Sequence, residues 1–83
     1  PVLTDTELAD LRAALDRVTA GESEKSPEAL RNLTGDPENV VTQIVNIWEA
    51  EPAFARHLHN DRIVAMAAQL MGADTVRVWH DQV

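Results

Sequence analysis

The residues from Val76 to Val83 constrain the fold more than any other part of this sequence. They read Val-Arg-Val-Trp-His-Asp-Gln-Val, an alternation that is typical of a β-strand. Successive side chains of a strand point to opposite faces, so one face is predicted to carry Val76, Val78, His80 and Gln82. The opposite face is predicted to carry Arg77, Trp79, Asp81 and Val83. A face that begins with valines and ends with polar, titratable groups is typical of the wall of a binding site.

No partner strand, turn or cap follows this predicted strand within the 83 residues. We therefore expect the chain to be the front part of a larger protein, with much of its chemistry beyond Val83. A strand without partners is expected to fray, to pair with a strand predicted at residues 40–47, or to pair across a dimer. In the last case the chain would associate with itself through strand edges.

Length and composition indicate one small globular domain over residues 1–83. Apolar residues make up 45% of the chain and charged residues 25%, which is ordinary for a soluble protein. Fourteen acidic residues oppose seven basic ones, and the formal charge is −7. The basic residues are scattered along the sequence. This charge balance argues against nucleic-acid binding, which needs a basic face.

The sequence contains no cysteine, which excludes disulfides and cysteine-based metal sites. Its longest apolar run, residues 63–68, is too short to span a membrane. No basic segment followed by an apolar stretch marks a signal peptide near Pro1. We therefore expect a cytoplasmic protein that does not bind membranes.

Residues 1–21 are predicted to form a surface helix that runs from about residue 5 to residue 20. Thr4 and Glu7 have the spacing of a capping box at its start. Gly21 is a typical residue for its C-terminal cap. A narrow apolar stripe follows at helical spacing: Leu8, Leu11, Leu15 and Val18.

The next segment, residues 22–39, is rich in polar and helix-breaking residues and is predicted to be a loop. Residues 28–33 could add a helical turn after Pro27. The apolar residues of the following run, 40–48, fit either a helix or a strand buried on both faces. Their β-branched side chains favour a strand over residues 40–47.

Residues 40–83 are predicted to have the order strand, helix, helix, strand. Pro52 suits the first position of a helix near residues 52–58. Asn60 suits the N-cap of a second helix near residues 61–71, which Gly72 ends. With the first helix, these elements give an α+β fold in which the two strands pair or lie in one sheet.

Several segments resemble the N-terminal region of the phytanoyl-CoA dioxygenase family. They are Leu3–Leu8, then Asn46–Phe54 with the sequence Asn-Ile-Trp-Glu-Ala-Glu-Pro-Ala-Phe, then Leu70-Met71-Gly72, and finally Val76–Gln82. Each motif is short, and the specificity lies in their order and spacing. Together they cover essentially the whole chain.

The resemblance implies a helical N-terminal region followed by the first strands of a double-stranded β-helix, or jelly-roll barrel. It also implies an oxygenase that uses iron(II) and 2-oxoglutarate to hydroxylate a small molecule or an acyl thioester. Members bind iron through a His-x-Asp pair and a distal His. They use an arginine for 2-oxoglutarate. These residues follow the strand that corresponds to Val76–Gln82, so we expect no catalytic residue, bound iron or activity in this chain by itself.

The tripeptide His59-Asn60-Asp61 spells His-x-Asp within the chain. An iron triad needs this pair beside a cavity, with a second histidine opposite. Here the pair is predicted to lie between two helices, and His57 would share an exposed junction without supporting contacts. Short motifs often match by accident. We therefore expect His59 and Asp61 to lie at a solvent-exposed helix junction and to match the metal-binding motif only by chance.

His80 and Gln82 are the residues that we expect to face a substrate or cosubstrate in the parent protein. The alternative is that both are ordinary polar residues of a barrel wall. Gln82→Ala is expected to weaken ligand binding more than Asp81→Ala, provided that Asp81 makes no buried structural bond. Trp48 and Trp79 are expected to be packing anchors.

Two further hypotheses compete with the oxygenase fragment and its small-molecule substrate. The chain could be a small acidic helical module that binds a partner protein through the apolar face of residues 63–71. It could also be a small regulatory subunit.

Overall fold

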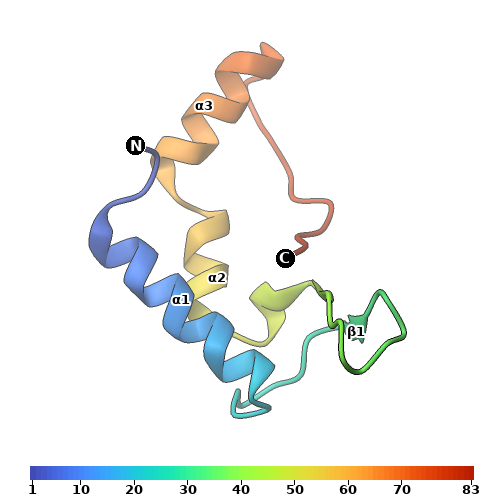
Figure 1. Ribbon diagram of the computed structural model, residues 1–83. Helices are drawn as coiled ribbons and strands as arrows, with labels where there is room; N and C mark the ends of the chain where they lie inside the picture. Colours follow the sequence, from blue (N-terminus) through green and yellow to red (C-terminus); the bar gives the residue numbers. More distant parts are fainter.

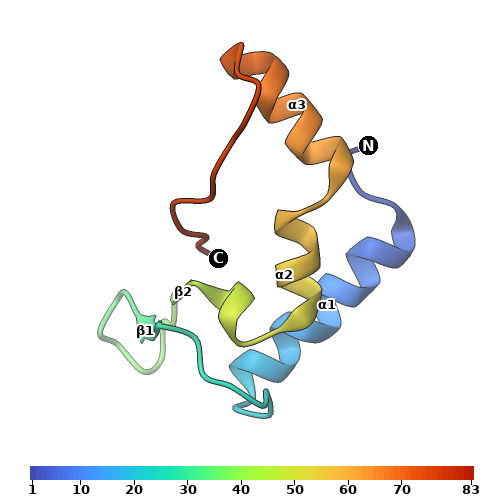
Figure 2. The same cartoon turned by 180° about the vertical axis from the view of Figure 1, so that it is seen from behind.

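The computed structural model describes all residues from 1 to 83 and shows an α+β fold. In sequence order the elements are α1 (Asp5–Thr19), β1 (Ala29–Asn32), β2 (Thr42–Val45), the short 3-10 helix η1 (Ile47–Glu49), α2 (Pro52–Leu58) and α3 (Asp61–Met71). Helices α1 and α2 lie side by side (Figure 1). The β-hairpin lies at one end of this pair and α3 at the other, as the reverse view also shows (Figure 2).

The predicted capping box at the start of α1 is confirmed. The Thr4 hydroxyl accepts a hydrogen bond from the Glu7 amide (3.2 Å), and the Glu7 carboxylate accepts one from the Thr4 amide (2.8 Å). The helix ends at Thr19, one residue earlier than expected. Gly21 follows with φ of 72°, in the left-handed region that glycine adopts without steric cost. Local signals therefore define both ends of α1.

The prediction that residues 22–39 form a loop with a helical turn is wrong for residues 29–32. These residues form β1, which pairs antiparallel with β2 in a register that places Leu30 opposite Ile44. The connecting loop is held by side chains that bond to the backbone. Asn32 Oδ1 accepts from the Val41 amide (3.0 Å), and Asp36 Oδ1 accepts from the Glu38 amide (2.9 Å). This loop chemistry and the β2 partner favour the strand over a helical turn.

The strand predicted at residues 40–47 is shorter in the structure, because Asn46 adopts a left-handed conformation with φ of 53°. This conformation ends β2 at Val45 and turns the chain into η1. The ordered sheet thus comprises two strands extended by a single antiparallel bridge. The jelly-roll barrel accordingly stays a prediction.

Helices α2 and α3 begin and end where the sequence predicts. Pro52 occupies the start of α2, and the Asn60 side chain accepts a hydrogen bond from the Arg62 amide at the start of α3 (3.1 Å). Gly72 caps α3 with φ of 61°. The start of α3 is tied to α1, since Asn60 donates to Glu7 (3.1 Å) and Arg62 forms an ion pair with the same carboxylate.

The buried apolar core is small and lies where α1, β2, η1 and α2 meet. Its members are Ala14, Val18, Ile44, Ile47, Ala50, Ala53 and Phe54. Neither tryptophan belongs to it, because Trp48 is 39% exposed and Trp79 is 92% exposed. The expectation that both tryptophans are packing anchors is therefore wrong. Small residues and isoleucines fill the narrow space between these elements, and the indoles lie outside it.

The chain is more open than a compact domain of its length. Its radius of gyration is 14.4 Å, whereas a compact chain of this length has about 12 Å. Its accessible surface is 6318 Å², compared with about 4,900 Å² for a compact monomer of this mass. Helix α3 contributes no buried residue. None of the helices combines the length and apolar character that crossing a bilayer would require.

Candidate functional site

The C-terminal segment, residues 73–83, returns to the sheet and docks on β2 with its last three residues. Ile44 and Val83 exchange two backbone hydrogen bonds (2.9 and 3.0 Å), and Val45 pairs antiparallel with Gln82. Pairing with the strand near residues 40–47 was one of three expected outcomes, and it is confirmed here. Residues 73–80 form no strand, so the predicted strand at residues 75–82 is wrong for most of its length. Their backbone has no neighbouring strand to pair with.

This docking forms one wall of a small polar pocket, which we call the Trp79 pocket. Its volume is about 440 Å³. The lining residues come from three segments of the chain: Glu28 and Arg31, then Gln43, Val45 and Asn46, and finally Trp79, His80 and Gln82. The two residues predicted to face a ligand, His80 and Gln82, thus lie in the same pocket.

The prediction that Trp79 lies on the opposite face from His80 and Gln82 assumes a strand that residues 76–80 do not form, and all three residues border one pocket. Strict alternation holds only where a strand is paired on a ladder, and residues 76–80 are not paired. Trp79 borders the pocket and is 92% exposed.

The Trp79 pocket is rich in hydrogen-bond donors. Arg31 contributes a guanidinium group, and Gln43 and Gln82 contribute amides that both donate and accept. The one carboxylate of the lining, Glu28, accepts a hydrogen bond from the Asn46 side chain. This arrangement suits a small, oxygen-rich ligand that carries negative or partial negative charge.

Asp81 is a half-buried residue of the C-terminal segment, and one of its carboxylate oxygens is inaccessible. Its Oδ1 atom is inaccessible and has no hydrogen-bond partner. Burial raises the pKa of Asp81, although the nearby amides of Trp48 and Ile47 favour the ionised form and oppose the shift. The comparison of Gln82→Ala with Asp81→Ala assumed that Asp81 makes no buried structural bond. The bonds of Asp81 to Asn46 use its backbone amide and carbonyl, which alanine would keep, and no side-chain hydrogen bond of Asp81 is found, so the comparison stays a prediction.

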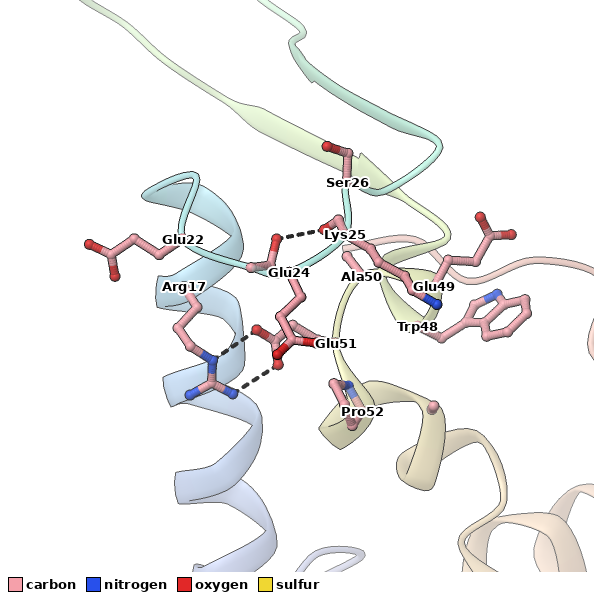
Figure 3. A pocket seen from close by; sticks show the side chains of 12 residues that line it. Arg17, Glu22, Glu24, Lys25, Ser26, Trp48, Glu49, Ala50, Glu51 and Pro52 are labelled. Atoms are coloured by element: carbon pink, nitrogen blue, oxygen red, sulfur yellow. Dashed lines mark hydrogen bonds and ion pairs between the residues drawn. The ribbon is translucent and has the colours of Figure 1, made fainter.

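A second and larger hollow, which we call the acidic cavity, has a volume of about 930 Å³. It lies between the end of α1, the loop of residues 22–26 and the start of α2 (Figure 3). Arg17 crosses its floor and donates two hydrogen bonds, each 2.8 Å long, to the Glu51 carboxylate. Glu51 is only 5% exposed, so this ion pair joins α1 to the start of α2.

Arg17 and Glu51 keep each other ionised at the base of the acidic cavity. The hydrogen bond from Arg17 lowers the pKa of Glu51, and the same bond raises the pKa of Arg17. Both groups are charged at neutral pH and satisfy each other. The remaining charged residues of the lining are exposed: Glu22, Glu24, Lys25 and Glu49. The geometry is that of a structural ion pair at the base of an open hollow.

No three histidine, aspartate or glutamate side chains lie close enough together to share one metal ion. His59 caps the end of α2 and is exposed, and Asp61 occupies the exposed first turn of α3. His57 borders a separate shallow pocket with Glu7 and Asp10. The His-x-Asp tripeptide therefore lies at a helix junction, where the sequence places it.

Comparison with protein-family models, curated proteins and solved structures finds no match for this chain. The candidate site therefore depends on the geometry of the chain and on the residues themselves.

Sequence reasoning missed the five residues that line the Trp79 pocket from the first two segments: Glu28, Arg31, Gln43, Val45 and Asn46. Arg31 lies on a strand that was expected to be part of a loop. One local signal was available for Asn46, because asparagine is among the few residues that readily adopt the left-handed conformation. It directly follows residues 40–45, which are β-branched apart from Gln43, and such a turn can end a strand there.

Proposed function

We propose that these 83 residues form the N-terminal part of an iron(II)- and 2-oxoglutarate-dependent oxygenase of the phytanoyl-CoA dioxygenase type. The proposal includes the finer fold prediction, in which β2 and the residues that pair with it at the end of the C-terminal segment belong to early strands of a jelly-roll barrel. The substrate class would be a small molecule or an acyl thioester. In such a protein this chain supplies a helical layer and one wall of the ligand site.

One observation carries the proposal. The two segments with the most distinctive resemblance, Asn46–Phe54 and Val76–Gln82, are distant in sequence and meet in the structure. The Asn46 amide donates to the Asp81 carbonyl (3.0 Å), next to the bridge between Val45 and Gln82. Two segments that each resemble the same family are therefore in contact in the structure. This contact supports the family resemblance more strongly than either segment does by itself.

The surroundings of His80 and Gln82 support the proposed role of this wall. Both lie in the Trp79 pocket with Arg31 and Gln43, where donors converge on a space of about 440 Å³. Small-molecule sites combine a few such polar groups with aromatic surface. We propose that His80 and Gln82 contact the substrate or 2-oxoglutarate. The iron ligands are expected outside the 83 residues, so no chemical step is assigned to this chain.

The first test is the coding sequence beyond the codon for Val83. The proposal requires a His-x-Asp motif and a later histidine there. The second test measures succinate formed from 2-oxoglutarate by the complete gene product with added iron(II). We expect turnover that depends on 2-oxoglutarate and none above a metal-only control for residues 1–83 alone. A complete product with no such motif and no turnover refutes the proposal.

The role of the pocket wall is tested in the complete product by Gln82→Ala, with Arg77→Ala as its matched control. Arg77 is exposed, lies in the same segment and does not line the Trp79 pocket. We expect Gln82→Ala to weaken the binding of substrate or 2-oxoglutarate and Arg77→Ala to leave it unchanged. Equal effects would mean that the ligand does not reach this wall.

A second candidate function is that of a small acidic module that binds a partner protein through α3. Leu70 is 89% exposed and Met71 is 69% exposed, on a helix with no buried residue. A partner protein would gain apolar contacts with this face. A coding sequence that ends near Val83 would favour this second function, whereas a downstream iron motif favours the oxygenase.

A further inference from the structure

Asn46 occupies a position where three segments of the chain meet. Its backbone amide donates to the Asp81 carbonyl (3.0 Å), and its side-chain Oδ1 accepts from the Asp81 amide (3.3 Å). Its Nδ2 atom donates to the carboxylate of Glu28. A single residue thus connects the end of β2, the approach to β1 and the C-terminal segment. We call the reciprocal contact the Asn46–Asp81 clasp.

The backbone conformation of Asn46 makes this clasp possible. It is the one non-glycine residue with positive φ in the chain. Left-handed geometry is uncommon for residues with a Cβ atom, and asparagine is several-fold enriched there. This conformation places the amide and the side-chain oxygen of one residue against the carbonyl and amide of Asp81. Alanine at the same position would keep the backbone strain and lose the side-chain contacts.

Few other contacts hold the C-terminal segment in place. Beyond the clasp, the backbone bonds between Ile44 and Val83 and the pairing of Val45 with Gln82 fix its last residues. The buried Oδ1 atom of Asp81 opposes these contacts, because a buried polar atom without a hydrogen bond costs free energy. The net free energy of docking is therefore small, and the contacts of one side chain are a large part of it.

We infer that Asn46 is a positioning residue, which docks the C-terminal segment beside β2 through the backbone of Asp81 and thereby builds the Trp79 pocket. Trp79, His80 and Gln82 form the wall that this segment contributes. With the clasp open, the residues of β1 and β2 keep their places and that wall is lost. The clasp does not depend on the oxygenase proposal; only the ligand contacts of His80 and Gln82 rest on it.

The test compares Asn46→Gly with Asn46→Asp by amide hydrogen exchange. Glycine keeps the left-handed backbone and removes both side-chain bonds. Aspartate tolerates the same backbone and keeps an oxygen acceptor for the Asp81 amide. We expect Asn46→Gly to accelerate exchange of the Ile44 and Val83 amides about five- to twentyfold, the factor for one to two ordinary hydrogen bonds. Asn46→Asp, made together with Glu28→Gln so that two carboxylates do not face each other, is expected to restore part of that protection.

Two controls separate local opening from general destabilisation. The Leu8 amide, bonded to Thr4 in α1, should exchange at an unchanged rate in every variant. Asp74→Asn changes an exposed carboxylate in the same segment and should leave all these rates unchanged. If Asn46→Gly has no effect on Ile44 and Val83, or accelerates Leu8 equally, the clasp does not control docking. A response at Val83 without oxygenase activity in the complete product leaves the clasp standing and refutes the proposed function.

Discussion

Truncation of two apolar side chains should change the free energy of unfolding by very different amounts, although both side chains lie in regular structure. Ile47 is fully buried, whereas Leu70 is 89% exposed on α3. Ile47→Val removes one methylene from the core, and Leu70→Ala removes three carbons from the surface. If burial decides the cost, the smaller deletion is the more harmful one.

The magnitudes follow from the size of the core. Seven buried apolar residues support the whole chain, so a void beside Ile47 has few neighbours that can move to fill it. Ile→Val in a core typically costs about 0.5–1.5 kcal/mol of the free energy of unfolding. An exposed substitution such as Leu70→Ala changes this free energy by less than about 0.5 kcal/mol. For a chain of this length the total is of the order of 4–12 kcal/mol.

The assay is urea denaturation of residues 1–83, followed by far-ultraviolet circular dichroism, with the midpoint and slope fitted for each variant. An unchanged slope shows that a shift of the midpoint reports stability alone. Protein concentration is varied tenfold, because a contact between copies makes the midpoint depend on concentration. If Leu70→Ala destabilises by more than about 1 kcal/mol, the face of α3 is covered in solution, and the open arrangement of α3 is wrong.

Three further outcomes follow from the charged groups. The hydrogen bond from the Thr4 amide, helped by Arg62, lowers the pKa of Glu7 to about 2. The ionised Glu7 carboxylate therefore stabilises the fold above pH 4.5, and this stabilisation disappears as the pH falls towards 2. The helicity of α1, followed by circular dichroism as a function of pH, measures this loss. Burial raises the pKa of Asp81, so attachment of the C-terminal segment weakens as the pH rises from 3.8 through that raised value, and Asp81→Asn should remove this dependence of Val83 exchange. Arg17→Gln leaves the buried Glu51 carboxylate without its ion pair and should lower the urea midpoint, and Glu51→Gln made in the same chain should recover part of the loss.

The helices could be predicted because their signals are local. The capping box of α1 needs only Thr4 and Glu7, three residues apart, and both bonds are present. Pro52, Asn60 and Gly72 likewise act within one turn of the helix ends that they define. Such signals do not depend on what the rest of the chain does. The bounds of all three α-helices therefore agree with the sequence to within one residue.

The sheet could not be predicted in the same way, because strands depend on partners. Residues 29–32 have no strong preference, and they become β1 through the register with β2 and the hydrogen bonds of the loop that Asn32 organises. The prediction that both tryptophans are packing anchors was wrong for a related reason. Aromatic residues are usually buried, but a core of this size has room for Phe54 and no space for two indoles.

The candidate site shows how a local pattern can identify residues and still misplace them. Alternation grouped His80 with Gln82, and both line the Trp79 pocket, but the same rule put Trp79 on the far side. Alternation describes a strand whose pairing is already fixed, and here only residues 81–83 are paired with β2. That pairing is set in large part by Asn46, which lies 35 residues before Asp81. On this inference the placement of Gln82 depends on a left-handed asparagine that follows another strand, and the residues around Gln82 give no local signal of that dependence.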